Sequence, residues 1–411
     1  MSAPTRPRTY GPDAPPTAAG AARARWHRCV NILPLAYLAA IVAVGLVHPF
    51  LPQWRWLLVH LLLLGAATNA ILVWSVHFAA ALLRVPASAH RRGEALRLGL
   101  LNAGAVAVLV GGTIGPGWLG VGGAAAVFVA VAAHLWTLAR WLRRALPARF
   151  AVTVHYYLTA AVALLVGIPV GAWMLVADHV RSRLVLFHAH VNVLGWVSLT
   201  VLGTLLTLWP AVLRTRLADR AIRAAVRALP LAGTGLVLLG IGLLAWWPTV
   251  AAAGLTLVGA AVVVIAVPAV VVAWQRPPDS FAAWSIAAGC GWLLVALIRD
   301  AATLLTATDL AASRFDDVLL PLLVGFVGQV LLGALAYLLP VVLGGGPTLV
   351  RARLDMLNRH WQQRVVMGNV AFAIFLLPVD PYVRITTSML VLVALVQFLV
   401  PAVRVLVAFR R

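Results

Sequence analysis

Residues 184–210 read LVLFHAHVNVLGWVSLTVLGTLLTLWP, a stretch without a single Asp, Glu, Lys or Arg. A membrane-spanning helix needs roughly 20 mainly apolar residues, so this stretch is long enough to cross a bilayer. Its histidines, His188 and His190, lie near its beginning, and Pro210 closes it. We therefore predict a transmembrane helix that carries two imidazoles near one surface of the membrane.

The composition extends this interpretation to the whole chain of 411 residues. Hydrophobic residues make up 63% and charged residues 10%, against about 45–50% and about 25% in soluble domains. So few charges cannot cover a water-facing surface, which excludes a soluble enzyme. The two cysteines, Cys29 and Cys290, form neither a metal-binding spacing nor a disulfide framework. We expect an all-α, polytopic membrane protein.

Apolar length predicts twelve spans. They lie near residues 30–49, 54–83, 97–114, 117–139, 151–177, 184–210, 229–247, 249–274, 281–299, 317–343, 362–379 and 385–408. Of the 32 basic residues, all arginine, 26 fall in segments on the side of the N-terminus and 6 on the other side. This asymmetry predicts cytoplasmic N- and C-termini in a bacterial plasma membrane. The net charge of +21 is therefore explained by arginines that orient the chain in the membrane and contact anionic lipid, and not by binding of nucleic acid.

The chain also indicates an internal repeat. The segments 60–65 (HLLLLG), 190–195 (HVNVLG) and 320–325 (LPLLVG) recur at a spacing of 130 residues. We expect a disordered basic cytoplasmic tail over residues 1–28, rather than a signal peptide. A single transmembrane domain over 29–411 should follow, in three pseudo-repeats of four helices, near 29–150, 151–280 and 281–411.

Three histidines are the main candidate site residues. His60 lies about two turns into the second span from the outer surface, and His188 and His190 lie at the same depth in the sixth. Histidine inside a membrane helix suggests a functional site. Because His60 and His190 occupy equivalent repeat positions, we expect them to supply both axial ligands of a haem. His188 lies about 200° around the helix from His190 and should face a neighbouring compartment, where it binds a second centre, a haem propionate or a copper ion.

Other residues carry weaker hypotheses. His48 and His179 are either solvated histidines or partners of His188 in an outer copper site. Arg181 and Arg183 contact either lipid headgroups or haem propionates. His77, His134 and His155, with Tyr156 and Tyr157, are either packing residues or an inner quinol or proton path.

The stretch Phe187–Pro210 resembles the His-x-His helix of the haem–copper oxidases and nitric oxide reductases, above all their C-type members, where Gly-Trp follows the histidines. Twelve helices, a three-fold repeat and a histidine on the second helix also resemble that superfamily's subunit I and the NnrS-like membrane proteins. Together with residues 336–347 (AYLLPVVLGGGP), the stretch resembles the membrane portion of bacterial copper oxidases of the multicopper oxidase or nitrite reductase type.

The resemblance implies haem b held by His60 and His190, with His188 matching the ligand of a second, high-spin haem. The chain departs from the family pattern in two ways. The His-x-His helix lies in the second repeat instead of the third, where Leu320 and Pro321 occupy the ligand positions, and no His-His pair exists. These departures argue against a binuclear centre that reduces oxygen or nitric oxide.

Three functions follow as hypotheses. The first is a haem-b redox protein that passes electrons from a membrane donor such as quinol to a copper partner at the outer face. The second is a haem-free transporter or channel, against which the apparent lack of intramembrane acids counts. The third is a non-catalytic anchor subunit of a copper oxidase. We expect any cupredoxin domain to be a separate polypeptide, because the last span ends close to Arg411.

Overall fold

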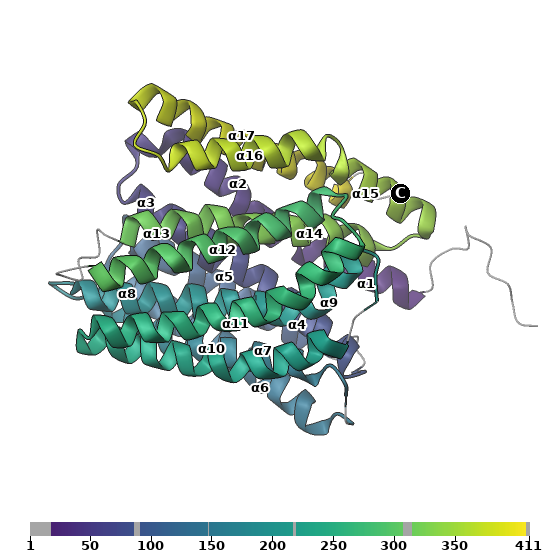
Figure 1. Ribbon diagram of the computed structural model, residues 1–411, viewed down its shortest axis with the longest axis horizontal. Coiled ribbons are helices and arrows are strands. Elements are labelled where there is room, and N and C mark those ends of the chain that lie inside the picture. The colour runs from purple at the N-terminus through teal and green to yellow at the C-terminus, as the bar shows by residue number, and fades with distance from the viewer. Residues whose placement is uncertain (1–17, 86–90, 147, 217–218, 307–314, 408–411) are drawn as a thin grey trace, which may run out of the picture.

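Every element of regular structure is helical in the computed structural model, which describes residues 18–85, 91–146, 148–216, 219–306 and 315–407 (Figure 1). The α-helices are α1 (Ala18–Val30), α2 (Ile32–Val47), α3 (Trp54–His60), α4 (Thr68–Leu82), α5 (Arg91–Gly111), α6 (Gly117–Arg144), α7 (Ala151–Met174), α8 (Ser182–His190), α9 (Leu199–Val212), α10 (Asp219–Ala245), α11 (Pro248–Gln275), α12 (Phe281–Thr306), α13 (Asp316–Leu320), α14 (Gln329–Leu343), α15 (Pro347–Asn358), α16 (Trp361–Phe375) and α17 (Pro381–Val407). A 3₁₀ turn, η1 (His48–Phe50), follows α2.

Eleven helical stretches in the described part of the chain are long and apolar enough to cross a membrane. This confirms a polytopic membrane protein, but not the expected number of twelve spans. The predicted span 362–379 corresponds to α16, which has 15 residues and a length of about 22 Å against a hydrocarbon core of about 30 Å. Leu376 and Leu377, which the prediction included, lie in the turn after the helix.

The expected N-terminal tail is only partly compatible with the structure. Residues 1–17 lie outside the described residues, but α1 begins at Ala18 and runs into the segment predicted to be disordered. Its sequence is rich in alanine and arginine, both good helix formers. His27 is buried, and α1 contacts α14 and α2, so tertiary packing stabilises this helix.

Three of the long helices form the centre of the bundle. They are Trp54–Leu82, Ser182–Val212 and Asp317–Leu343, and 50%, 78% and 61% of their apolar windows are buried. Figure 1 shows their first segments, α3, α8 and α13, at one end of the molecule, and α15 with α1 at the other. The indole Nε1 of Trp196 donates to Oγ1 of Thr68 (3.0 Å), which links two of the central helices.

Each central helix contains a π-helical segment. These segments are η2 (Leu61–Ala67), η4 (Val191–Ser198) and η6 (Pro321–Gly328). From Leu61 to Val191 and from Val191 to Pro321 the spacing is 130 residues. Single π turns are rare and often mark functional sites, and in two of the three helices the π segment begins directly after a histidine, His60 or His190.

A glycine lets a neighbouring helix approach each π segment closely. A Cβ at Gly65 would lie 2.3 Å from Cδ1 of Tyr37 in α2, and a Cβ at Gly325 would lie 2.6 Å from Cγ of Trp292 in α12. At Gly195 the corresponding atom would lie 2.6 Å from Cβ of Ala163 in α7. Since carbon atoms cannot approach so closely without a shift, a glycine is required at all three positions.

Candidate functional site

The structure places His60 beside His188. His60 is the last residue of α3, and His188 lies in the last turn of α8. Their ring centres are 6.4 Å apart and the ring planes differ by 25°. The two side chains come from different central helices, so only the tertiary fold brings them together.

Each of these imidazoles uses Nδ1 for a backbone carbonyl. Nδ1 of His60 donates to the oxygen of Trp56 (2.8 Å), and Nδ1 of His188 donates to the oxygen of Gly167 (3.0 Å). A carbonyl oxygen can only accept, so Nδ1 carries the proton and Nε2 keeps its lone pair. Metal-binding histidines are commonly oriented by a hydrogen bond of this kind. Nδ2 of Asn192, which can only donate, lies 3.2 Å from the same nitrogen of His188. The shorter contact to the oxygen of Gly167 assigns the proton to Nδ1 of His188.

The surroundings hold both rings in place. The ring of Trp56 stacks on His60, with 4.0 Å between the ring centres. Gly112 admits this indole, since a Cβ there would lie 2.3 Å from its Cη2 atom. Gly171 does the same for His188, because a Cβ at that position would lie 2.5 Å from Cε1 of the imidazole. The site is thus preorganised by packing.

His190 faces another part of the bundle, which corrects the expected pairing of His60 with His190. Its Nε2 lies 2.8 Å from Oδ2 of Asp300 in α12, and its Nδ1 donates to the oxygen of Leu186 (2.6 Å). Both ring nitrogens are therefore engaged, and the ring packs against Phe315. The expectation that equivalent repeat positions face one common interior is wrong, because His190 points to α12 and His60 lies next to His188.

Asp300 was missed by sequence reasoning, because the predicted ninth span ended at residue 299. In the structure α12 continues to Thr306 and Asp300 is buried. The argument that intramembrane acids are missing is therefore wrong. One sequence signal could have revealed that the helix continues past Asp300. The run Ala301–Leu305, which follows it, is apolar except for Thr303.

The expected outer copper site is not formed by the described residues. Among them no three His, Cys, Asp or Glu side chains come together as a possible metal site. Nδ1 of His48 donates to the oxygen of Gly45 (2.9 Å), and its ring packs on Trp54. His179 lies in the segment between α7 and α8. Neither histidine completes a three-ligand group with His188.

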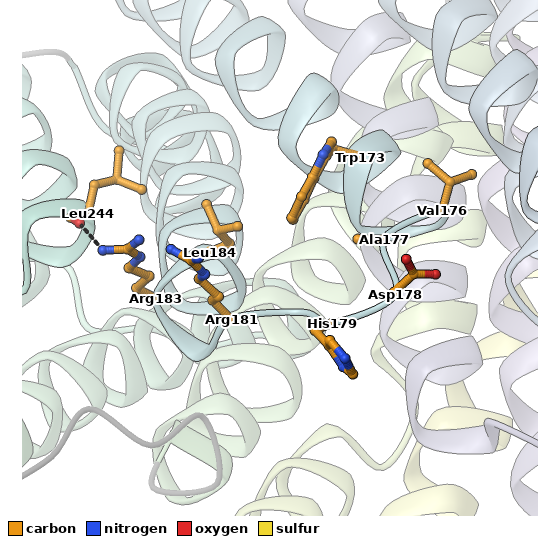
Figure 2. Close-up of a pocket in the computed structure, with 9 residues that line it drawn as sticks. All are labelled: Trp173, Val176, Ala177, Asp178, His179, Arg181, Arg183, Leu184 and Leu244. Atoms are coloured by element: carbon orange, nitrogen blue, oxygen red, sulfur yellow. Dashed lines mark hydrogen bonds between the residues drawn. The ribbon is translucent and has the colours of Figure 1, made fainter.

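Arg181 and Arg183 line a cavity of about 630 Å³ at the start of α8 (Figure 2). Nη1 of Arg183 donates to the oxygen of Leu244 (3.3 Å). Figure 2 shows the two arginines side by side, with the side chain of His179 directed away from them. From Arg181 to His188 the helix rises by about 10 Å, so the arginines lie between the surface and the imidazole pair.

The residues of the expected inner path are dispersed. His77 packs against His27 and Trp74, and His134 lies 3.1 Å from the hydroxyl of Ser75. His155 is bonded to its own helix. The hydroxyl of Tyr156 donates to the oxygen of Ala225 (2.9 Å), and that of Tyr157 is hydrogen-bonded to the hydroxyl of Thr204 (3.0 Å). The structure does not join these groups into one continuous path.

Comparisons with protein-family models and with curated proteins give no match for this chain.

Proposed function

We propose that this protein is a membrane redox protein that binds haem b through His60 and His188. The observation that carries the proposal is the pair of imidazoles 6.4 Å apart, each tied through Nδ1 to a carbonyl. A metal–nitrogen bond of about 2.0 Å on each side, added to about 1.1 Å from nitrogen to ring centre, gives roughly 6.2 Å between two imidazoles that share one metal ion. The observed distance of 6.4 Å between the ring centres is close to this value, and shared ligation would require the two Nε2 atoms to face one another across the metal ion.

The number of ligands favours haem over a bare metal ion. Haem iron takes four nitrogens from its porphyrin and needs only axial ligands from the protein. A bare zinc or copper ion usually takes three or four protein ligands. The described residues offer no third His, Cys, Asp or Glu for a metal site. Two imidazoles therefore form a complete set of protein ligands for haem iron and an incomplete set for a bare metal ion.

The proposed architecture is three units of four helices, as in the haem–copper oxidases that the sequence resembles. The 130-residue spacing of η2, η4 and η6 supports it. The ends of the central helices give further support, since φ is positive at Arg84 (56°), Arg214 (54°) and Gly344 (59°), again 130 residues apart. Equivalent helix ends and π segments are difficult to explain by chance packing of apolar helices.

The same comparison explains why His188 is the partner of His60. Gly195 contacts Ala163 and Gly325 contacts Trp292, so α7 and α12 correspond at a spacing of 129 residues. In that register the counterpart of Asp300 is Gly171. His190 contacts the carboxylate of Asp300. At the corresponding position near His60 the chain has Gly171, which carries no side chain, and the ring of His188 occupies the space.

In this proposal the chain orients the haem and sets its environment, and the bound group supplies one-electron chemistry. His60 and His188 would hold the iron, and Arg181 and Arg183 would bind acidic groups near the surface. With cytoplasmic termini, this end of the bundle faces outward. A quinol in the bilayer is the proposed donor, and a cupredoxin-type copper protein outside is the proposed acceptor.

A pyridine haemochrome spectrum with metal analysis of the purified protein tests the proposal. We expect a b-type spectrum that is lost in His60→Ala and in His188→Ala. His155→Ala is the matched control, because that imidazole is exposed and bonded only to its own helix. A folded wild-type protein without haem would refute the proposal. So would a His188→Ala variant that keeps the full spectrum.

A second candidate function, a haem-free transporter, is favoured by one observation. The buried Asp300–His190 pair is an ionisable group inside the membrane region, and such groups often mark ion pathways. Uptake of solute or ions by proteoliposomes, measured with wild type and with Asp300→Asn, distinguishes this function from electron transfer. Haem-free protein that shows Asp300-dependent uptake would establish the transporter.

A further inference from the structure

A second cavity lies at the opposite end of the bundle from His60 and His188. It has a volume of about 1130 Å³. It is formed where α4 ends, α5 begins, α6 ends and α7 begins, so four helix ends surround it. Its lining residues are Ala81, Leu82, Leu83, Arg84, Val85, Gly93, Arg97, Trp136, Thr137, Arg140, Trp141, Arg144, Ala145, Leu146, Ala148, Arg149 and Phe150.

The lining is strongly basic. It contains five arginines and, among the described residues, no Asp or Glu. Among the described residues, Arg149 alone of these five has a carboxylate in salt-bridge contact, that of Asp219. The guanidinium of Arg140 lies over the ring of Trp136, 5.2 Å from its centre, an arrangement that keeps its positive charge. Asp219 and Glu94, which interacts electrostatically with Arg97, offset part of the positive charge, and five arginines still leave the cavity basic.

The side chain of Arg97 is directed into the protein. Its Nη1 donates to Oγ1 of Thr137 (2.8 Å), whereas its Nη2 is buried and makes no hydrogen bond with any described residue. Glu94 borders a smaller neighbouring cavity together with Arg97, and the described residues form no salt bridge between the two. The guanidinium of Arg97 is thus fixed in the wall of the cavity by Thr137.

Aromatic and aliphatic side chains form the rest of the wall. Trp136, Trp141 and Phe150 provide flat apolar surfaces beside the guanidinium groups. A ligand that suits this lining has an anionic head and tolerates apolar contact. The volume exceeds the roughly 300–1,000 Å³ typical of ligand pockets, so the cavity has room for a large phosphate-bearing group.

We propose that this cavity binds a phosphate-bearing anion, held by Arg84, Arg97, Arg140 and Arg144. Guanidinium groups bind phosphate oxygens through paired hydrogen bonds, and basic pockets between transmembrane helices bind anionic lipid heads. The phosphate belongs either to a membrane lipid or to a soluble molecule.

The second unit shows that topology does not require such a cavity. Arg223 and Arg227 lie on α10 at the same end of the bundle, and both are exposed. Neither lines any of the three cavities described here. Arginines that only orient the chain can stay on the surface, whereas Arg97 is positioned in the wall of a cavity.

Native mass spectrometry of the full chain in mild detergent tests the proposal. One arm adds phosphatidylglycerol or cardiolipin, with phosphatidylcholine for comparison, and the other adds pyrophosphate. The variants are Arg97→Gln and the double variant Arg140→Gln/Arg144→Gln, whose side chains lie nearer the surface and which should leave the fold intact. Arg223→Gln/Arg227→Gln is the matched control, since it removes the same charge at the same end of the bundle.

We expect binding of one anionic probe to weaken at least about tenfold in both test variants and to stay unchanged in the control. Selective binding of the anionic lipid assigns the site to a lipid head, and binding of pyrophosphate assigns it to a soluble anion. Either result supports the site. Equal affinity of wild type, test variants and control for every probe would overturn it, as would a wild type that binds no probe.

Discussion

The contact between His190 and Asp300 gives the sharpest test of the tertiary structure. These residues are 110 positions apart, on α8 and α12. Their side chains are 1% and 5% exposed, so water cannot replace a lost partner. We consider the substitutions His190→Leu and Asp300→Leu, singly and together.

The expected cost follows from the geometry. Neutral hydrogen bonds between membrane helices contribute only about 0.6 kcal/mol on average, but a charge-assisted bond is roughly twice as strong. Removing one partner also leaves a buried polar group unsatisfied, at a cost of about 1–3 kcal/mol. We therefore expect each single variant to lose about 2–3 kcal/mol. The double variant should lose less than the sum, because replacing a buried pair by apolar residues is often neutral.

A double-mutant cycle measures this coupling. Unfolding of purified wild-type and variant proteins in mixed micelles of increasing SDS content is followed by fluorescence of the 16 tryptophans. The free energies of the four proteins give the interaction energy. Asp300→Asn is the conservative control. Its amide can still form a hydrogen bond with Nε2 of His190, so it should cost less than half as much as Asp300→Leu.

The reasoning would be refuted by additive effects. If the double variant loses the sum of the single losses within about 0.5 kcal/mol, His190 and Asp300 do not interact as described. The same variants test the assignment of the haem ligands, because His190→Leu should keep the b-type spectrum that His188→Ala loses.

Two further substitutions test the packing of the central helices. Gly171→Val should displace His188, because a Cβ would lie 2.5 Å from its ring. We expect the haem spectrum to be lost while gel filtration shows an intact fold. The control Gly259→Val, where a Cβ meets nothing within 4 Å, should change neither the spectrum nor the elution. Thr68→Val removes the acceptor of the Trp196 indole, and leaving that buried N–H unsatisfied should cost about 1–3 kcal/mol in the SDS assay; a loss below about 0.5 kcal/mol would contradict the described bond.

Much of the fold could be predicted because hydropathy is a local property. Ten of the twelve predicted spans overlap a long apolar helix closely, and the first is part of the longer stretch Ala18–Phe50. The errors lie at helix ends. Residues 362–379 contain a turn after Phe375, and α12 continues past residue 299 to Thr306. Apolar composition does not distinguish an apolar turn from a helix, and a buried carboxylate inside a helix resembles a polar helix end.

The candidate site was predicted only in part. The sequence singled out His60, His188 and His190 and placed them at one depth, and the angle of about 200° between His188 and His190 correctly sends them to different neighbours. The choice of partner was wrong. It assumed a common interior, whereas the sixth helix faces α7 and His60 on one side and α12 on the other.

The sequence by itself determined the class of this protein and the approximate extent of its helices. These depend on how many apolar residues follow one another along the chain. The tertiary structure decided which side chains meet: His188 with His60, and His190 with Asp300. Those contacts depend on the rotation of each helix about its axis, which is set by the close approach of neighbouring helices at a few glycines and is not encoded in the hydropathy of any single helix.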